Sequence, residues 1–182
     1  IETSGTLIWP LSHGFVRLVG LQHKDRIRVT ADVAGSLRAL RGARFLAGHN
    51  ILGFDLIALA TGYGLDIQEL ADNGQLMDTM LTEILSNPPE AGIAVGRVLK
   101  EYSLDTLGQR KFGVGKTGSL PKLAKHHGGF GKIPTDDPEY RAYCAGDVNL
   151  TSRLVVSQAG ARTPYVVREH RVMAIAAQMR TN

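Results

Sequence analysis

Short apolar runs near the start of this 182-residue chain give way to apolar residues at helical spacing. Residues 15–22 and 26–30 are rich in Val, Ile and Leu and are separated by the polar segment 23–25, which predicts an antiparallel hairpin. Two further strands are predicted at 44–47 and 76–77. Since strands come first and then alternate with helices, the pattern predicts an α/β layer with a mixed sheet.

The helical spacing also predicts where the helices lie. They cover residues 34–41, 54–63, a segment ending at Leu85, a short segment beginning at Ser103, 137–158 and 165–179. Between residues 112 and 134 the chain is rich in Gly and Lys, which predicts a stretch dominated by loops. Residues 160–164 are interpreted as a linker.

The composition, with 43% hydrophobic and 21% charged residues, is that of one globular domain with a sizeable core. The lone cysteine, Cys144, cannot pair within the chain, so a reducing cytoplasm is the expected compartment. No apolar run has the roughly 18 to 20 residues of a membrane-spanning helix, so no membrane partner is expected. Because the chain opens at Ile1 and stops within a predicted helix, we interpret it as a fragment of a longer protein.

The net charge of +4 conceals a segregation along the sequence. Residues 45–96 contain seven acidic residues and no Lys or Arg, whereas residues 97–132 contain eight basic and two acidic residues. The acidic segment is suited to binding cations and the basic segment to binding phosphates. The alternative interpretation is that both are ordinary solvated surfaces of opposite sign.

Two patterns fail as binding sites because their spacing is wrong. Residues 113–117 contain Gly-Lys-Thr, but a P-loop requires Gly at the position of Arg110, so a flexible basic loop is the better interpretation. The pair His126-His127, even with His49 and Cys144, lacks the closely paired ligands of a structural zinc site. Neither pattern therefore predicts a nucleoside triphosphate or zinc site.

Acidic groups from three distant segments make a better candidate site. Glu2 ends an apolar N-terminal strand, and Asp55 lies in the first turn of a helix that follows Asn50. Tyr143 and Asp147 are four residues apart on the long helix, so both project from one face. Each motif alone fits helix capping or a solvated surface. Together, three carboxylates and a phenol have the composition of a two-metal phosphodiesterase site that holds Mg²⁺ or Mn²⁺.

The ordered set of motifs resembles a known family of nucleases. Glu2-Thr3, Asn50-x-x-x-Phe54-Asp55 and Tyr143-x-x-x-Asp147 resemble the Exo I, Exo II and Exo III motifs of DEDDy 3′-5′ exonucleases, the DnaQ-like branch of the ribonuclease H fold. Met77-Asp78-Thr79 and Ser103-Leu104 resemble accessory signatures of that family. The resemblance implies that residues 1–160 form a ribonuclease H-like mixed β-sheet flanked by helices.

The end of the chain extends the resemblance to DNA polymerases. Glu169-His170-Arg171 and Gln178-Met179-Arg180 are similar to the beginning of the polymerase region in phage-type family A DNA polymerases. The resemblance implies that residues 161–182 are a linker and first helix leading into a polymerase domain. It also implies a bacteriophage enzyme acting in the host cytoplasm, which removes nucleotides from a single-stranded or frayed 3′ end of DNA during proofreading.

Roles follow from the resemblance residue by residue. Glu2 and Asp147 would ligate the nucleophile-side metal, Asp55 would serve the second metal, and Tyr143 would orient the attacking water. The residues expected to bind substrate are Thr3 through its backbone, Asn50 and Phe54 on the final nucleotides, and the basic residues Lys116, Lys122 and Lys125 on the single-stranded phosphate backbone.

Two family positions are not matched within the chain. The Exo I motif is D-x-E, and its Asp would be the residue immediately before Ile1. The family also places a Leu wedge six residues after that Asp, a position that is Thr6 here, with Leu7 one step later. We expect the parent protein to carry this Asp and to be active; if the Asp is missing, one bridging ligand is gone and activity should collapse.

Two alternative functions remain. A stand-alone DEDDy exoribonuclease similar to ribonuclease D shares the chemistry, but the polymerase-like residues after Gly160 favour a polymerase domain. A catalytically silent nucleic-acid-binding domain is the other alternative, and it is disfavoured because Glu2, Asp55, Tyr143 and Asp147 are all present.

Overall fold

Strands of both orientations form the centre of the protein. The computed structural model describes residues 1–5 and 14–181, so the wedge position at Thr6 and Leu7 lies outside the described residues. The strands are β1 (Glu2–Thr3), β2 (Val16–His23), β3 (Arg26–Thr30), β4 (Leu46–Gly48) and β5 (Leu76–Asp78). β1, β2 and β3 pair antiparallel, and β4 pairs with β5 in parallel. The predicted α/β class, with mixed strand directions, is confirmed.

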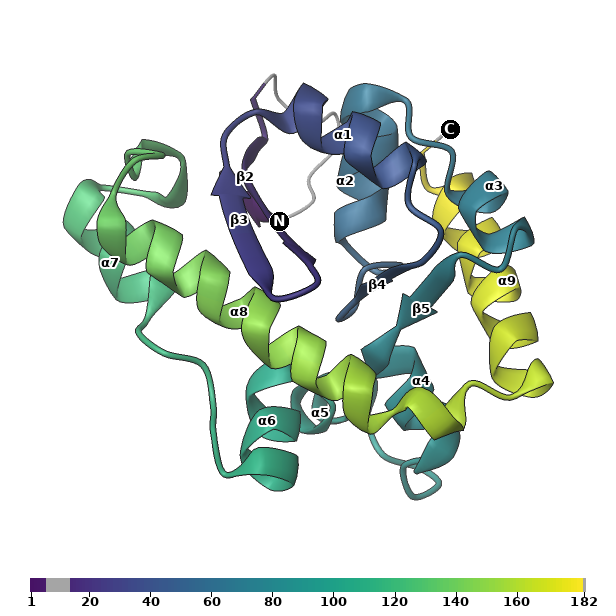
Figure 1. Cartoon of the computed structure of the whole chain (residues 1–182). Helices are drawn as coiled ribbons and strands as arrows, with labels where there is room; N and C mark the ends of the chain where they lie inside the picture. The colour runs from purple at the N-terminus through teal and green to yellow at the C-terminus, as the bar shows by residue number, and fades with distance from the viewer. Residues whose placement is uncertain (6–13, 182) are drawn as a thin grey trace.

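Helices surround these strands (Figure 1). They are α1 (Val33–Arg41), α2 (Asp55–Tyr63), α3 (Ile67–Asp72), α4 (Thr79–Ser86), α5 (Val95–Glu101), α6 (Leu104–Phe112), α7 (Leu120–His127), α8 (Pro138–Ser157) and α9 (Pro164–Met179), with short 3-10 helices at Phe130–Lys132 and Ala159–Ala161. The long helix α8 crosses the molecule and contacts β2, β3 and β4.

The strand register fixes the position of Glu2. The β2–β3 hairpin turns between His23 and Arg26, which are paired residues, and Lys24 in the turn has a positive φ of 55°. β1 adds to the other edge of β2, with Glu2 opposite Leu18. Glu2 is thereby held beside a buried strand rather than on a solvated end.

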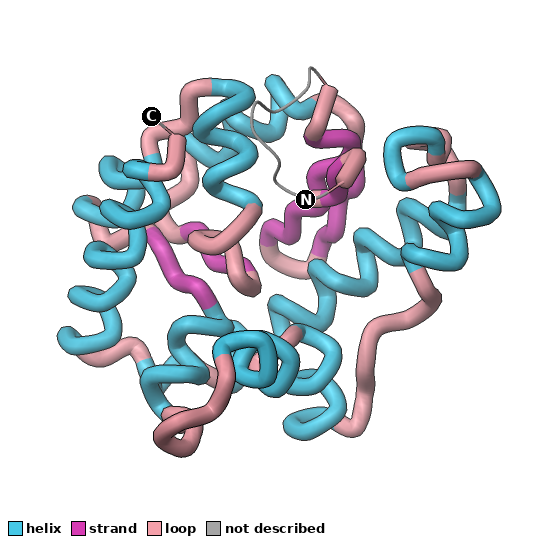
Figure 2. Tube along the Cα trace, turned by 180° about the vertical axis from the view of Figure 1, so that it is seen from behind, coloured by secondary structure: helices cyan, strands magenta, loops and turns pink. Residues whose placement is uncertain are grey.

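The two groups of strands do not form one continuous sheet in the described parts of the chain, 1–5 and 14–181. Figure 2 shows them from behind as two separate sets of strands. Helix α8 spans both, since it contacts β2 of one set and β4 of the other. The face of α8 that meets the strands therefore lies where residues from both sets converge.

The largest core cluster includes the last helix. Val16 and Val19 of β2, Leu56 of α2 and Ala174 and Ala177 of α9 all belong to it. Smaller clusters lie between α7, α8 and β2 and between α6 and α8. Helix α9 packs chiefly against α3, so residues 164–179 are part of the same packed body as the preceding helices.

The segment predicted to be loop-dominated contains a regular helix, so that prediction is wrong. Helix α7 occupies Leu120–His127 inside it, with a proline in the first turn and Gly128 in the left-handed conformation after its end. Leu123 and Ala124 bury one face in the second core cluster. The apolar spacing of this face and the Gly128 stop are a helix signal that the abundance of Gly and Lys masked.

Other boundaries shift slightly. The strand predicted at 44–47 runs from Leu46 to Gly48, because its pairing with β5 begins with Leu46 opposite Leu76. Helices α3 and α5 were not predicted, since each has fewer than eight residues and offers little periodicity. The hairpin, α1, α2, α4, α6, α8 and α9 lie where they were predicted, within one or two residues.

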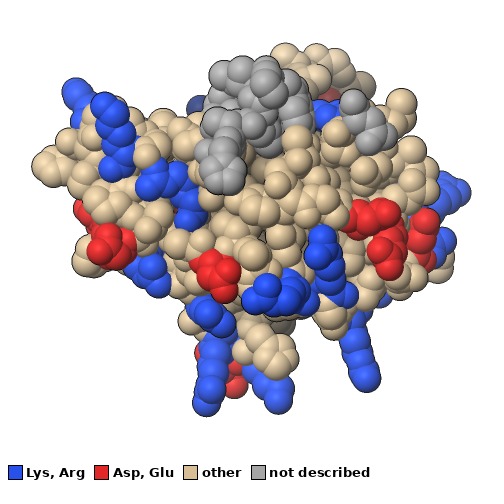
Figure 3. Space-filling model, turned by 90° about the horizontal axis from the view of Figure 1, so that it is seen from above, with Lys and Arg blue, Asp and Glu red and all other residues tan. Residues whose placement is uncertain are grey.

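The charge segregation along the sequence is partly cancelled in space. Glu83 of the acidic segment is buried and pairs with Lys111 at 2.9 Å and Arg110 at 3.3 Å from the basic segment. On the face seen in Figure 3, acidic side chains lie in small groups with basic side chains between them. Within residues 1–5 and 14–181, no helix has the length and apolar character needed to cross a membrane.

Candidate active site

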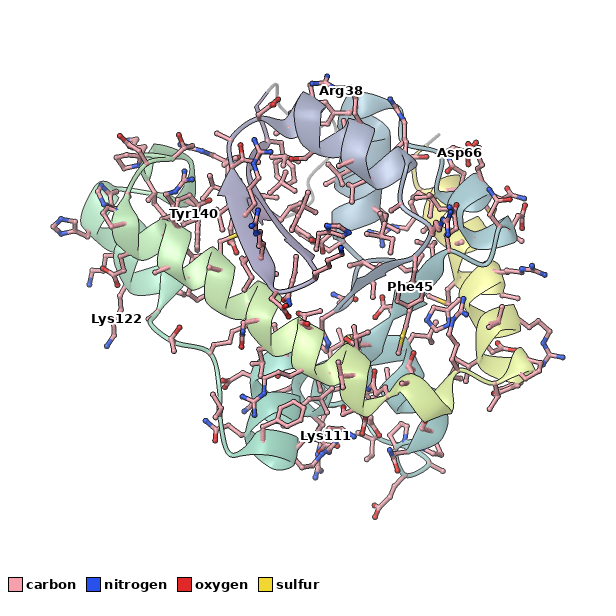
Figure 4. The ribbon with its side chains drawn as sticks, viewed as in Figure 1. Arg38, Phe45, Asp66, Lys111, Lys122 and Tyr140 are labelled. Atoms are coloured by element: carbon pink, nitrogen blue, oxygen red, sulfur yellow. The ribbon has the colours of Figure 1, made fainter. Side chains whose placement is uncertain are left out.

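One cavity brings together most of the predicted site residues. It has a volume of about 1020 Å³ and is lined by residues of β1, β2, β4, α2 and α8. The predicted residues that line it are Glu2, Thr3, Asn50, Phe54, Asp55, Lys116, Tyr143 and Asp147. Lys122 and Lys125 are exposed on α7 and do not line it, and Figure 4 shows Lys122 on the outer side of that helix.

Glu2 is the most buried of the carboxylates in this cavity, at 9% exposure. Burial raises the pKa of Glu2 to about 7, and the nearby charges of Asp147 and Asp55 act in the same direction. The Lys116 ammonium opposes this rise. The carboxylates of the cavity therefore act on one another as a single electrostatic cluster.

Asp55 enters the cavity from the first residue of α2. Its Oδ1 lies 2.5 Å from the backbone nitrogen of Ile1, so the two motifs predicted to join are in direct contact. Phe54 caps the same helix, and its ring packs at a 45° tilt against Phe15, with 6.5 Å between ring centroids. Asn50 has a left-handed backbone, with φ of 56°, which asparagine adopts more readily than most residues.

Asp78 holds the loop that carries these residues. Its carboxylate is 3% exposed and accepts hydrogen bonds from the backbone of Asn50 at 2.9 Å and Leu52 at 3.1 Å. The same carboxylate caps α4 by accepting from Met80 and Leu81. Burial raises the pKa of Asp78, while these four donors favour its charged form. This part of the accessory signature therefore positions the cavity wall.

Tyr143 and Asp147 lie on one face of α8, as their spacing predicts, and both meet Lys116. The Lys116 ammonium lies 2.6 Å from Asp147 Oδ2 and 3.0 Å from the Tyr143 hydroxyl. Burial raises the pKa of Asp147, although the Lys116 charge opposes the rise. Burial also raises the pKa of Tyr143, so its hydroxyl keeps its proton at neutral pH.

The acidic side chains share the cavity, but Asp55 and Asp147 each contact a nitrogen of the chain rather than one another. Within residues 1–5 and 14–181, no three His, Cys, Asp or Glu side chains lie close enough together to hold a metal ion. Asp55 contacts the backbone nitrogen of Ile1, and Asp147 pairs with Lys116. Lys116 was predicted to contact the substrate, and its pairing with Asp147 leaves no signal in the sequence, because it depends on how a loop lies across α8.

His49 is a cavity residue that sequence analysis did not assign to the site. Its Nδ1 lies 2.9 Å from Thr79 Oγ1, and its Nε2 is buried without a partner among the described residues. Burial and, to a smaller extent, the Lys116 charge lower the pKa of His49 from 6.5 to about 4. Its position directly before Asn50 was the available signal.

This shift predicts that acid destabilises the protein through His49. Between pH 6.5 and 4 the unfolded chain binds a proton at this residue and the folded chain does not, so stability falls as pH falls through that window. The loss is roughly 2 to 3 kcal/mol, at about 1.4 kcal/mol per pH unit. Urea unfolding of wild type and His49→Gln at pH 4.5 and 7.5 measures it, with the exposed His23→Gln as control. An identical pH dependence in wild type and His49→Gln would contradict the prediction.

Comparisons with models of protein families, with curated proteins and with solved structures found no match to this chain. The side chains that line the cavity, and the charges they carry, therefore provide the basis for assigning a function.

Proposed function

We propose that the chain is the 3′-5′ proofreading exonuclease domain of a DNA-directed DNA polymerase, with a ribonuclease H-like (DnaQ-like) fold. It hydrolyses the 3′-terminal phosphodiester of single-stranded DNA and releases deoxynucleoside monophosphates, with two divalent cations, Mg²⁺ or Mn²⁺. The observation that carries the proposal is that Glu2, Asp55, Tyr143 and Asp147, from three distant segments, line one cavity.

The chemistry of the donor set suits divalent cations, although the three carboxylates do not lie close enough together in this structure to hold one ion. Glu2, Asp55 and Asp147 offer only hard carboxylate oxygens, which Mg²⁺ and Mn²⁺ prefer. Burial and mutual repulsion raise the pKa of Glu2 and Asp147, and bound cations would relieve both effects. When bound, two such cations activate a water and stabilise the leaving oxygen of a phosphodiester.

The other residues of the cavity position the substrate and water. The Tyr143 hydroxyl keeps its proton and orients the attacking water by hydrogen bonding. Phe54 offers a partly exposed ring for the terminal base, and Asn50 and the Thr3 backbone hold the final nucleotides beside it. Lys122 and Lys125 lie outside the cavity and contact the strand farther from its 3′ end.

The same proposal assigns residues 161–182 as the segment that leads into a polymerase domain of the same chain. Its helix α9 packs against α3, and the Gln178 side chain accepts a hydrogen bond from the Ile67 backbone at 3.1 Å. The segment is thus anchored on the exonuclease body, which would fix where a following polymerase domain begins.

Degradation of a 5′-labelled single-stranded oligonucleotide tests the proposed function. The protein is assayed with its natural residues upstream of Ile1, with Mg²⁺ or Mn²⁺ and in EDTA. A ladder of 3′-shortened products that disappears in EDTA is expected, because the carboxylates cannot activate water without cations. A matched RNA oligonucleotide, degraded more slowly, separates this function from that of an exoribonuclease.

The assay can also contradict the proposal. Binding of the DNA without a ladder under either metal would favour the catalytically silent nucleic-acid-binding domain. Degradation that continues unchanged in EDTA would exclude a two-metal site built from Glu2, Asp55 and Asp147.

A further inference from the structure

Lys116 lies inside the carboxylate cluster of the cavity rather than on a solvated surface. Its ammonium donates to Asp147 Oδ2 at 2.6 Å and to the Tyr143 hydroxyl at 3.0 Å, and it lies 5.1 Å from the centroid of the Tyr143 ring. The Lys116 and Asp147 side chains are 30% and 20% exposed, so water screens the pair only in part. The Asp147 carboxylate, the Tyr143 hydroxyl and the Tyr143 ring thus all lie beside the same ammonium group.

The loop that carries Lys116 is built to reach this position. The Lys116 backbone N–H donates to Asp105 Oδ1 at 2.8 Å, and a Cβ on the preceding Gly115 would overlap the Asp105 carboxylate. On the facing side, a Cβ on Gly146 of α8 would lie 2.9 Å from Thr117 Oγ1. Glycines on both sides of the contact let the loop lie close against α8 between Tyr143 and Asp147.

The Lys116 ammonium and a divalent cation would bind the same carboxylate oxygens of this site. Each is attracted by the carboxylate oxygens, and the Asp147 Oδ2 that Lys116 occupies is one of the donors assigned to a metal. Because Lys116 is tethered, its ammonium stays near Asp147 at high local concentration, without any ion from solution. A metal that binds Asp147 through this oxygen must displace the ammonium.

We propose that Lys116 is a tethered counterion that balances the carboxylate cluster in the absence of metal and competes with the divalent cation for Asp147. This inference rests on the proposed two-metal function. The competition weakens metal binding in the free enzyme, and metal binding releases the ammonium from Asp147. The released side chain lies at the cavity wall, where it faces the phosphate of a bound strand.

Titration with Mn²⁺ tests the competition without relying on activity. Electron paramagnetic resonance of free Mn²⁺ gives the dissociation constant for wild type, Lys116→Met, Lys116→Arg and the exposed control Lys125→Met. Lys116→Met is expected to bind Mn²⁺ about tenfold more tightly, since a charge-assisted hydrogen bond to the ligand is removed. Lys116→Arg and Lys125→Met are expected to stay within about threefold of wild type, because a charged partner remains at Asp147 in each.

Thermal unfolding of the same variants provides a second readout. In EDTA, Lys116→Met is expected to unfold at a lower temperature than Lys125→Met, because Asp147 loses its counterion, and Mn²⁺ should restore more of its stability. Suppose that wild type binds Mn²⁺ and Asp147→Asn does not. If Lys116→Met then binds Mn²⁺ no more tightly than wild type, the proposed competition is wrong, but the proposed function is not affected. Absence of Mn²⁺ binding in wild type and Lys116→Met alike overturns the proposed function as well.

Discussion

Asp147→Asn is expected to lower the rate of the proposed Mg²⁺-dependent release of deoxynucleoside monophosphates by roughly 1000-fold or more, since loss of the proposed metal ligand removes several kcal/mol of transition-state stabilisation. The amide has nearly the shape of the carboxylate but lacks its charge. The amide oxygen still accepts a hydrogen bond from Lys116, so the loop that carries Lys116 stays packed against α8. The measurement is the initial rate on a single-stranded oligonucleotide at saturating Mg²⁺.

Asp136→Asn is the matched control for this change. Asp136 is exposed just before the same helix, so its substitution removes the same charge outside the cavity. It is expected to leave the rate within about twofold, since exposed charges interact weakly. Circular dichroism and the thermal midpoint should show that both variants are folded. An Asp147→Asn enzyme that keeps a tenth or more of the wild-type rate would exclude Asp147 as a metal ligand.

The features that the sequence predicted well depend on local periodicity. The four-residue spacing of Tyr143 and Asp147 on an uninterrupted helix allowed only one face for both, and both line the cavity. The hairpin followed from two apolar runs with a polar turn between them, and the β2–β3 register confirms it. Such signals survive folding because they are set by residues within a few positions of one another.

Features that depend on distant contacts were not predictable in the same way. The separation of β1–β3 from β4–β5 depends on how α8 packs across both, which no local pattern encodes. The pairing of Lys116 with Asp147 joins residues 31 positions apart through a glycine-containing loop. From the sequence alone, a basic residue in such a loop is equally consistent with a phosphate-binding residue and with a counterion of a carboxylate. Only its contacts in the folded chain distinguish the two roles.

The buried Asp78 is expected to be the residue outside the cavity whose loss damages both stability and activity most. Asp78→Ala leaves the backbone N–H groups of Asn50, Leu52, Met80 and Leu81 without their acceptor. We expect a loss of roughly 3 to 5 kcal/mol in the free energy of unfolding, at about 1 to 3 kcal/mol for each buried donor left unpaired and with part of the loss recovered by hydration. Urea unfolding at pH 7 measures it.

A graded pair of variants makes the prediction specific to this hydrogen-bond network. In Asp78→Asn the side-chain oxygen at the Oδ1 position still accepts hydrogen bonds from Asn50, Met80 and Leu81. Only the Leu52 N–H, which donates to Oδ2, loses its acceptor. The free energy of unfolding should therefore fall by about 1 to 2 kcal/mol. Asp72→Ala, exposed at the end of α3, should change stability by less than about 0.5 kcal/mol. Because the network holds the loop between β4 and Asp55, the cleavage rate should fall in the same order at a temperature where every variant is folded. Equal unfolding midpoints for Asp78→Ala and Asp72→Ala would show that the network does not hold this loop.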